Sequence, residues 1–291
     1  MFFLISGFSE HLSKTDTWDE CLTKNIRKLL IPYLLFAVLS VALNSILHNS
    51  YTTIVPDVLW VLKGVPRNWF CAVSLWFLTC LFIIRLAFFA LRKYFKKPLH
   101  MLVVSFLLYV AGDSFVNRGH WLLSIFNIDN ALYFLLFYVI GYLSFIKVRS
   151  LMDWNTFRKK IVFFCIAAMS ALYTILIFFG KKPLHDLFNF NHYVLLLIEI
   201  IHPLILCAFA LAIAKLIEDI DLFQKLGQET LYLCGTEFFT NSFLTAIILY
   251  FGVMPNYINT FAPYIYAMAL LMTGHHIFVP FVKSILKKLG C

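Results

Sequence analysis

The chain has 291 residues, of which 62% are hydrophobic and 13% are charged. A soluble domain is nearer half apolar and a quarter charged, so this composition indicates a membrane protein. The formal net charge of +9 does not indicate nucleic-acid binding, because the basic residues lie in short clusters between apolar runs and not on one soluble face.

The apolar stretch 1–8 is too short to cross a bilayer, and we expect it to be the end of a membrane helix. Eight longer apolar stretches follow. A backbone in lipid must satisfy its own hydrogen bonds, and these stretches lack the alternation of barrel strands, so each is predicted to be an α-helical span. The spans are 28–48, 70–91, 99–115, 128–146, 161–180, 193–215, 230–252 and 261–283. The predicted fold class is therefore all-α: a polytopic integral-membrane helical bundle with eight full spans plus an N-terminal half-helix, in a single domain over 1–291.

The loops between the spans differ in charge. Of the 24 Lys and Arg residues, 18 lie in one alternating set of loops and 5 in the other, with Arg85 inside a span. The positive-inside rule then predicts a multi-pass protein of the cell membrane with both ends cytoplasmic. The loops are too short for a separate extramembrane enzyme, so any chemistry is expected within the bundle or at its mouths.

A basic run, Lys24, Arg27 and Lys28, leads directly into the first full span. One interpretation is topological, because such a cluster holds that end of the helix at the cytoplasmic face. The other is functional, because the same cations can bind an anionic cofactor at the mouth of the bundle.

Several ionisable residues lie inside predicted spans, where each is costly and indicates a function. Glu199 and His202 are three residues apart on one helical face, so together they form a candidate acid–base pair. The full set is Arg85, Asp129, Glu199, His202, Glu237, His275 and His276.

Structural interpretations compete for some of these residues. Arg85 can extend its side chain to the cytoplasmic interface. His202 can bond a carbonyl that Pro203 leaves free, and His275 can hydrogen-bond between helices. For Glu237 the structural interpretation is weaker, because a carboxylate deep in a span has no easy neutral partner.

Other chemical signatures are not found. The seven cysteines have no paired spacing, so neither a disulfide framework nor a zinc site is indicated, and no metal is predicted. Phosphate-binding, dinucleotide-binding and hydrolase motifs of soluble enzymes are absent from the sequence.

Five stretches in order resemble the membrane-bound acyltransferase family 3, especially its branch of fucose 4-O-acetylase-like sugar O-acetyltransferases. They are Phe2–Phe8, Lys24–Lys28 leading into Leu30–Tyr33, Ser74–Leu78, Asp129–Leu132 with Phe137 and Gly141-Tyr142 after it, and Gly227–Leu233. The resemblance covers essentially the whole chain. It implies ten membrane helices with both ends cytoplasmic, of which 1–8 and the eight spans would be helices two to ten.

The resemblance also implies a reaction. An acyl group, usually acetyl, moves from acyl-coenzyme A to a hydroxyl of a cell-envelope polysaccharide or lipid-linked sugar. Lys24, Arg27 and Lys28 would hold the phosphates of the donor, although Asn25 stands where a basic residue is common. The residues that would line or brace the tunnel between donor and acceptor are Trp76, Arg85, Asp129 and Glu237.

One departure concerns the base. The family's catalytic His near the end of the first helix has no counterpart here, since His11 lies in the predicted loop beyond 1–8. Where many members carry His in the penultimate helix, this chain has Glu237. We expect that the chain lacks the family's first helix, because Met1 falls in the middle of a helix; the alternatives are an inactive relative, or a chain in which Glu237, or His202 beside Glu199, has become the base.

Two other functions fit the same residues. A transporter or flippase for a glycolipid or solute would equally use intramembrane Arg, Glu and His side chains. A catalytically inactive scaffold would bind a partner enzyme through its helices. The sequence does not indicate the acceptor sugar, the acyl group or the oligomeric state.

Overall fold

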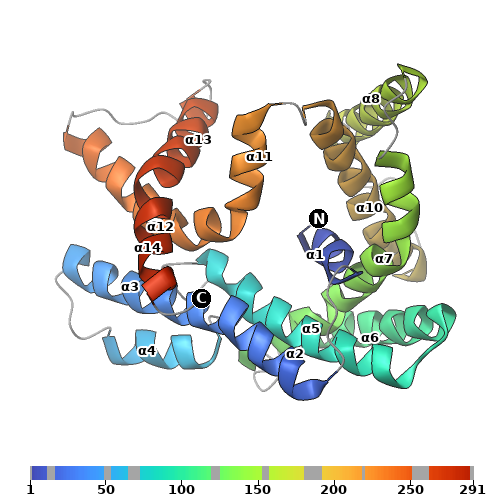
Figure 1. The fold of residues 1–291 in the computed structure, drawn as a ribbon, viewed down its shortest axis with the longest axis horizontal. Coiled ribbons are helices and arrows are strands. Elements are labelled where there is room, and N and C mark those ends of the chain that lie inside the picture. Colours follow the sequence, from blue (N-terminus) through green and yellow to red (C-terminus); the bar gives the residue numbers. More distant parts are fainter. Residues whose placement is uncertain are drawn as a thin grey trace. The chain divides into compact units, whose positions relative to one another are not determined.

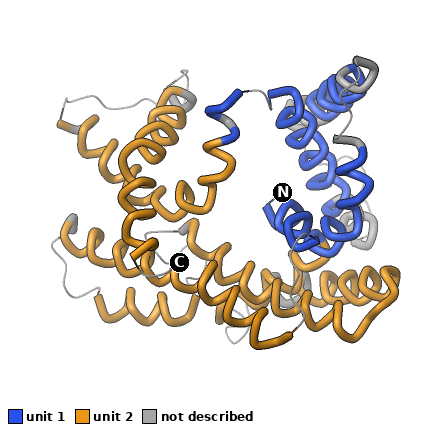
Figure 2. Tube along the Cα trace, viewed as in Figure 1, with its two compact units in different colours: residues 1–13, 137–224 blue, residues 14–136, 225–291 orange. Residues whose placement is uncertain are grey.

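The computed structural model describes residues 2–11, 17–48, 54–64, 73–118, 125–152, 157–179, 192–217, 220–250 and 262–288. Every regular element in these residues is helical, and they contain no β-strand (Figure 1). The chain forms two compact units, drawn blue and orange in Figure 2. Unit 1 contains Met1–Ser13 and Phe137–Gln224, and unit 2 contains Lys14–Leu136 and Lys225–Cys291.

Unit 1 consists of α1 (Phe2–His11), the C-terminal part of α7 (Ile128–Met152), α8 (Phe157–Phe179), α10 (His192–Leu216) and the first residues of α11 (Asp221–Gln228). The antiparallel pair α8 and α10 packs together along much of its length. In this unit α1 crosses α7 at two glycines, Gly7 and Gly141, whose missing side chains let the backbones approach closely. At the same crossing the buried Tyr138 hydroxyl donates a hydrogen bond of 3.0 Å to Glu10 Oε2.

Unit 2 holds the other helices. In chain order these are α2 (Trp18–Asn25), η1 (Ile26–Leu30), α3 (Ile31–His48), α4 (Ile54–Leu62), η3 (Val73–Leu75), α5 (Trp76–Tyr94), α6 (Pro98–Arg118), η4 (Ile125–Asn127), the start of α7, the rest of α11, α12 (Thr230–Tyr250), α13 (Ala262–Thr273), η5 (Gly274–Phe278) and α14 (Val279–Lys288).

Two long helices of unit 2 contain a π-helical turn, in which a backbone N–H bonds the carbonyl five residues back instead of four. Across η1, which joins α2 to α3, Ile31 N–H donates to the carbonyl of Ile26. Across η5, which joins α13 to α14, Val279 N–H donates to the carbonyl of Gly274. Such turns often lie at functional sites. The ionisable residues in these turns are Arg27 and Lys28 in η1 and His275 and His276 in η5.

A buried cluster of hydrogen bonds joins the segments around α4, α5 and η4. The Thr79 hydroxyl donates to the carbonyl of Gly64 at 2.9 Å, and Asn127 Nδ2 lies 2.8 Å from the same carbonyl and 2.9 Å from Thr79 Oγ1. Gly64 has φ +92°, and a Cβ there would lie 2.6 Å from Phe126 Cα, so only glycine fits. The side chains of Thr79 and Asn127 are thus satisfied inside the protein, as an apolar environment requires.

Each predicted span overlaps helical elements in the residues that the structure describes, while residues 70–72, 180, 251–252 and 261 of these spans lie outside the described residues. In the described part of the chain, four helices are long and apolar enough to cross a membrane: Trp18–Ile46, Ile125–Ser150, Glu199–Leu216 and Ile265–Lys288. Two shorter apolar helices, Pro98–Gly112 and Ile161–Leu172, accompany them. The protein is therefore all-helical with membrane-spanning character, and the number of eight full spans is not confirmed.

Three short helices lie where the sequence predicts loops, namely α2, α4 and α11. The half-helix expected at 1–8 extends to His11, so the placement of His11 in a loop is wrong. The imidazole of His11 packs against two rings of α7, with centroids 5.1 Å from Tyr142 and 4.9 Å from Phe145. This packing explains why the helix continues to that residue.

We predict that Gly141→Ala destabilises the protein by about 1–3 kcal/mol, the usual cost of overpacking a closely packed contact. A Cβ at this position would overlap the carbonyl oxygen of Leu4, which belongs to the backbone and has little room to move. Thermal unfolding in detergent measures the effect. The matched control is Gly227→Ala, where a Cβ meets nothing within 4 Å; equal stability of the two variants would contradict the close α1–α7 crossing.

Candidate functional site

The structure brings the three predicted phosphate-binding residues together. Lys24 lies in the last turn of α2, and Arg27 and Lys28 follow in η1, about one helical turn further on. They line a hollow of about 520 Å³, which we call the basic groove. Arg27 and Lys28 are exposed to it. The residues lining the basic groove are Asp19, Glu20, Thr23, Lys24, Arg27 and Lys28.

The two carboxylates of the basic groove lie in the first turn of α2, where the positive end of the helix dipole stabilises them. That turn begins at Thr17, whose hydroxyl oxygen accepts a hydrogen bond from the backbone N–H of Glu20 at 3.3 Å. The groove therefore has two acidic residues at the start of α2 and three cations near the junction of α2 and η1. An anion would be held at the cationic end.

Arg85 lies next to this region and is not isolated. Its Nη1 donates a 3.1 Å hydrogen bond to Asn25 Oδ1, and Asn25 is 5% exposed at the junction of α2 and η1. The amide Nδ2 of Asn25 in turn donates a hydrogen bond of 3.4 Å to Cys21 Sγ. The neutral amide at position 25 is thus explained, because a basic side chain there could not accept a hydrogen bond from Arg85.

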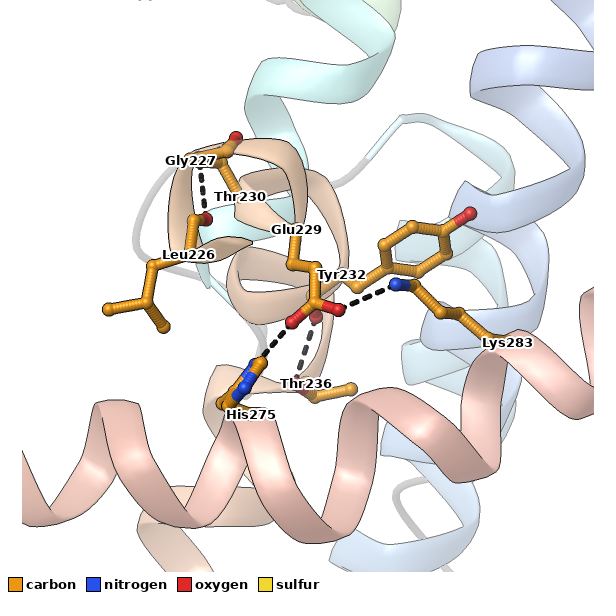
Figure 3. Close-up of polar contacts among 8 residues, drawn as sticks. All are labelled: Leu226, Gly227, Glu229, Thr230, Tyr232, Thr236, His275 and Lys283. Carbon is orange, nitrogen blue, oxygen red and sulfur yellow. Dashed lines mark hydrogen bonds and ion pairs between the residues drawn. The ribbon is translucent and has the colours of Figure 1, made fainter. Parts of the chain in front are cut away.

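A second polar cluster joins α12 to the helix that contains η5 and α14 (Figure 3). Glu229, the residue before α12, accepts from Lys283 Nζ at 2.6 Å through Oε1 and hydrogen-bonds His275 Nδ1 through Oε2. Lys283 Nζ also lies 5.3 Å from the ring centroid of Tyr232, within cation–π range. We call Glu229, His275 and Lys283 the Glu229 clasp.

The clasp keeps Glu229 ionised. Desolvation raises the pKa of Glu229, but the hydrogen bonds from Lys283 and His275 and their positive charges outweigh it, so the pKa is lowered from its ordinary value. The side chains of Glu229 and His275 are each 15% exposed, and that of Lys283 is 43% exposed. The cluster is therefore neither deeply buried nor freely solvated.

Glu237 lies about two helical turns into α12. It lines a cavity of about 140 Å³ whose other lining residues are mostly apolar. Glu237 itself is exposed. Gly274 of η5 is part of the cavity wall, and its small size lets the turn approach Leu233 of α12. The lining residues are Leu233, Cys234, Glu237, Thr240, Leu270, Leu271 and Gly274.

The predicted acid–base residues belong to different units of the structure. Glu199 and His202 lie in α10 of unit 1, where Glu199 is exposed and His202 is half-buried, while Glu237 belongs to unit 2. The catalytic roles of these three residues stay predictions. Pro203 lies inside α10, as the sequence indicated.

Trp76 and Asp129 both begin a helix of unit 2. Trp76 starts α5, and its ring centroid is 6.0 Å from that of Phe134 on α7. Asp129 lies in the first turn of α7, where its Oδ1 accepts from the backbone N–H of Asn130 at 2.8 Å. Their contacts are consistent with bracing, and a role in lining a tunnel stays a prediction.

The sequence did not single out Glu229 or Lys283 as site residues. One signal was present: the loops containing 215–229 and 283–291 belong to the same alternating set, so both residues were predicted at the same side of the membrane. Combining this placement with their opposite charges would have indicated the pair.

The lowered pKa of Glu229 predicts how the stability of the folded protein changes at acid pH. A carboxyl whose pKa is lower in the folded than in the unfolded protein adds stability that is complete above its ordinary pKa and is lost as the pH falls through the folded value. We therefore expect the difference in Tm between the wild type and Glu229→Gln to be largest near neutral pH and to shrink below about pH 4.5. Thermal unfolding across this range measures it.

The control for this prediction is Glu20→Gln, which removes an exposed carboxylate of α2 outside the clasp. Its Tm difference from the wild type is expected to be small throughout. A difference for Glu229→Gln that stays constant with pH would show that the clasp does not stabilise the ionised carboxylate.

Comparison with known proteins adds to this geometry. A family model described as an acyltransferase domain, of the acyltransferase 3 family, matches residues 1–234, which include the basic groove, Arg85 and Glu229. Searches of curated proteins and of solved structures return no match. In the described residues no group of three or more His, Cys, Asp or Glu side chains is arranged to hold a metal ion. The matched region covers most of the chain and the structure has apolar helices of membrane-spanning length, so the protein belongs to the acyltransferase 3 family of membrane acyltransferases.

Proposed function

We propose that the protein is an integral-membrane O-acyltransferase that moves an acyl group, usually acetyl, from acyl-coenzyme A to a hydroxyl of a cell-envelope polysaccharide or lipid-linked sugar. The observation that carries this proposal is the basic groove, which gathers three cations beside the first predicted span of an acyltransferase-family chain. The donor's phosphates are the anions for which such a groove is suited.

The placement of the basic groove supports a cytosolic donor. The loop charges predict that Lys24, Arg27 and Lys28 lie at the cytoplasmic boundary, where acyl-coenzyme A is available. Arg27 can make paired hydrogen bonds to a phosphate, and the two lysines act as point charges. Arg85 donates a hydrogen bond to Asn25 at the junction of α2 and η1, next to the groove residues. We therefore expect Arg85 to brace this junction.

The reaction sets further requirements. The acceptor hydroxyl oxygen attacks the thioester carbonyl carbon, a C–O bond forms, the C–S bond breaks, and the coenzyme leaves as a thiolate while a base takes the hydroxyl proton. Glu237, and His202 with Glu199, are the acid–base residues predicted from the sequence. Glu237 belongs to the same unit as the basic groove and lines a cavity, which favours it among the three.

The direct test uses membranes that contain the full chain and acetyl-coenzyme A labelled in the acetyl group. We expect label to enter the lipid-linked sugar or polysaccharide fraction, and membranes without the protein to give none. Binding of the donor without any transfer would favour the inactive scaffold, and neither binding nor transfer would favour a transporter or flippase. Either result would overturn the proposal.

A second prediction concerns the donor. Replacing Lys24, Arg27 and Lys28 together by Gln is expected to weaken acetyl-coenzyme A binding roughly 100-fold, at about 1 kcal/mol for each lost contact to phosphate. Titration calorimetry on the detergent-solubilised protein measures it. The matched control removes three exposed charges away from the groove, with Lys93, Lys96 and Lys97 replaced by Gln; an equal loss in the control would assign the effect to overall charge.

A further inference from the structure

We propose that His275 is the general base of the acyl transfer, with Glu229 as the residue that positions its imidazole and Lys283 as the residue that holds Glu229. This inference rests on the proposed function and assigns the proton acceptor to a histidine that the sequence analysis lists only among the intramembrane ionisable residues. The proposal starts from geometry: the carboxylate of Glu229, in the turn before α12, contacts a histidine of η5 and a lysine of α14 (Figure 3).

The hydrogen bond fixes which nitrogen can act. His275 Nδ1 faces Glu229 Oε2, so in the neutral imidazole Nδ1 carries the proton and donates it to the carboxylate. Nε2 is then the unprotonated nitrogen, with a lone pair available to take a proton. In the part of the chain that the structure describes, no residue hydrogen-bonds Nε2. A nucleophile's base oriented by a carboxylate is a recurring arrangement in acyl transfer.

Lys283 gives the arrangement its charge balance. Its ammonium group neutralises Glu229 through Oε1, and its contact with the Tyr232 ring holds it in place. When His275 is in its neutral form, the cluster of Lys283, Glu229 and His275 carries no net charge. When His275 takes a proton, the carboxylate beside it stabilises the imidazolium that forms.

The backbone around His275 is unusual in a way that suits this role. His275 lies in η5, where the extra residue of the π turn departs from the regular helical ladder. Gly274, the residue before it, lines the cavity of about 140 Å³ together with Glu237. His275 follows this glycine in the turn but is not itself among the residues that line the cavity.

The position relative to the membrane also fits. Glu229 immediately precedes the predicted span 230–252 and Lys283 ends the predicted span 261–283, so the loop charges place the clasp at the cytoplasmic boundary. The basic groove is predicted at the same boundary and belongs to the same unit. A donor held by its phosphates at this boundary would therefore be on the same predicted side of the membrane as the clasp.

In the proposed step, His275 Nε2 takes the proton of the acceptor hydroxyl as its oxygen bonds to the thioester carbonyl carbon. The C–S bond then breaks, and the coenzyme thiolate leaves and takes the proton from the imidazolium. Atoms and charges balance with no further reactant, and the base is restored for the next turnover.

The test compares His275→Gln with His276→Gln. His276 is the adjacent histidine of η5, its ring centroid is 4.7 Å from that of His275, and it is exposed. We expect His275→Gln to lower the rate of transfer from labelled acetyl-coenzyme A by about 10²- to 10⁴-fold, the usual contribution of a general base, with donor binding unchanged. His276→Gln is expected to retain the wild-type rate.

Two further measurements separate catalysis from structure. Added imidazole is expected to restore part of the rate to His275→Ala, which a merely structural residue would not allow. Glu229→Gln is expected to lower the rate roughly 10- to 100-fold and Glu229→Asp less, as for an orienting partner. If His275→Gln fails to fold, these two measurements still decide the question.

The outcomes distinguish this inference from the proposed function. No transfer by the wild type would overturn the proposed function itself. Transfer by the wild type with a full rate for His275→Gln, or a loss for His275→Ala that imidazole does not restore while Glu229→Gln keeps a full rate, would overturn the role of His275 and leave the acyltransferase intact.

Discussion

A polar group placed in an apolar environment must find its partner inside the protein, and this constraint governs the structure at every level. It makes the backbone helical, because a helix bonds its own N–H and C=O groups. It also favours pairs between polar side chains that lie far apart in the sequence. Thr79 and Asn127 bond the carbonyl of Gly64, Asn25 accepts from Arg85, and Glu229 bonds His275 and Lys283.

The paired residues differ in how far apart they are in the sequence, and this separation decides which features could be predicted from the sequence. The long apolar helices could be predicted because apolar length is a local property. The basic groove was predicted because Lys24, Arg27 and Lys28 lie within one turn, so their spacing alone brings them together. By contrast, Arg85 bonds a residue 60 positions away, and Glu229 bonds residues 46 and 54 positions away. Such pairs depend on how helices pack, which no local pattern records.

The short elements were missed for a related reason. The stretch at α4 is apolar but only nine residues long, too short for a span, so apolar length alone does not predict it. His11 extends α1 because Tyr142 and Phe145 of α7 pack against it. The π turns are likewise invisible in hydrophobic periodicity, since one added residue leaves the apolar run unbroken.

Binding and proton transfer make opposite demands on charge, and the two clusters of unit 2 differ accordingly. To attract an anionic donor, a site needs cations exposed to solvent, and Arg27 and Lys28 are exposed in the basic groove. To accept a proton near neutral pH, a histidine needs a fixed orientation and no excess charge at rest, and the Glu229 clasp offers a carboxylate already paired with Lys283. Had the cations of the groove been adjacent to His275, they would have disfavoured the imidazolium that a base must form. In the proposed mechanism, donor binding and proton transfer would thus belong to two separate π turns, η1 and η5.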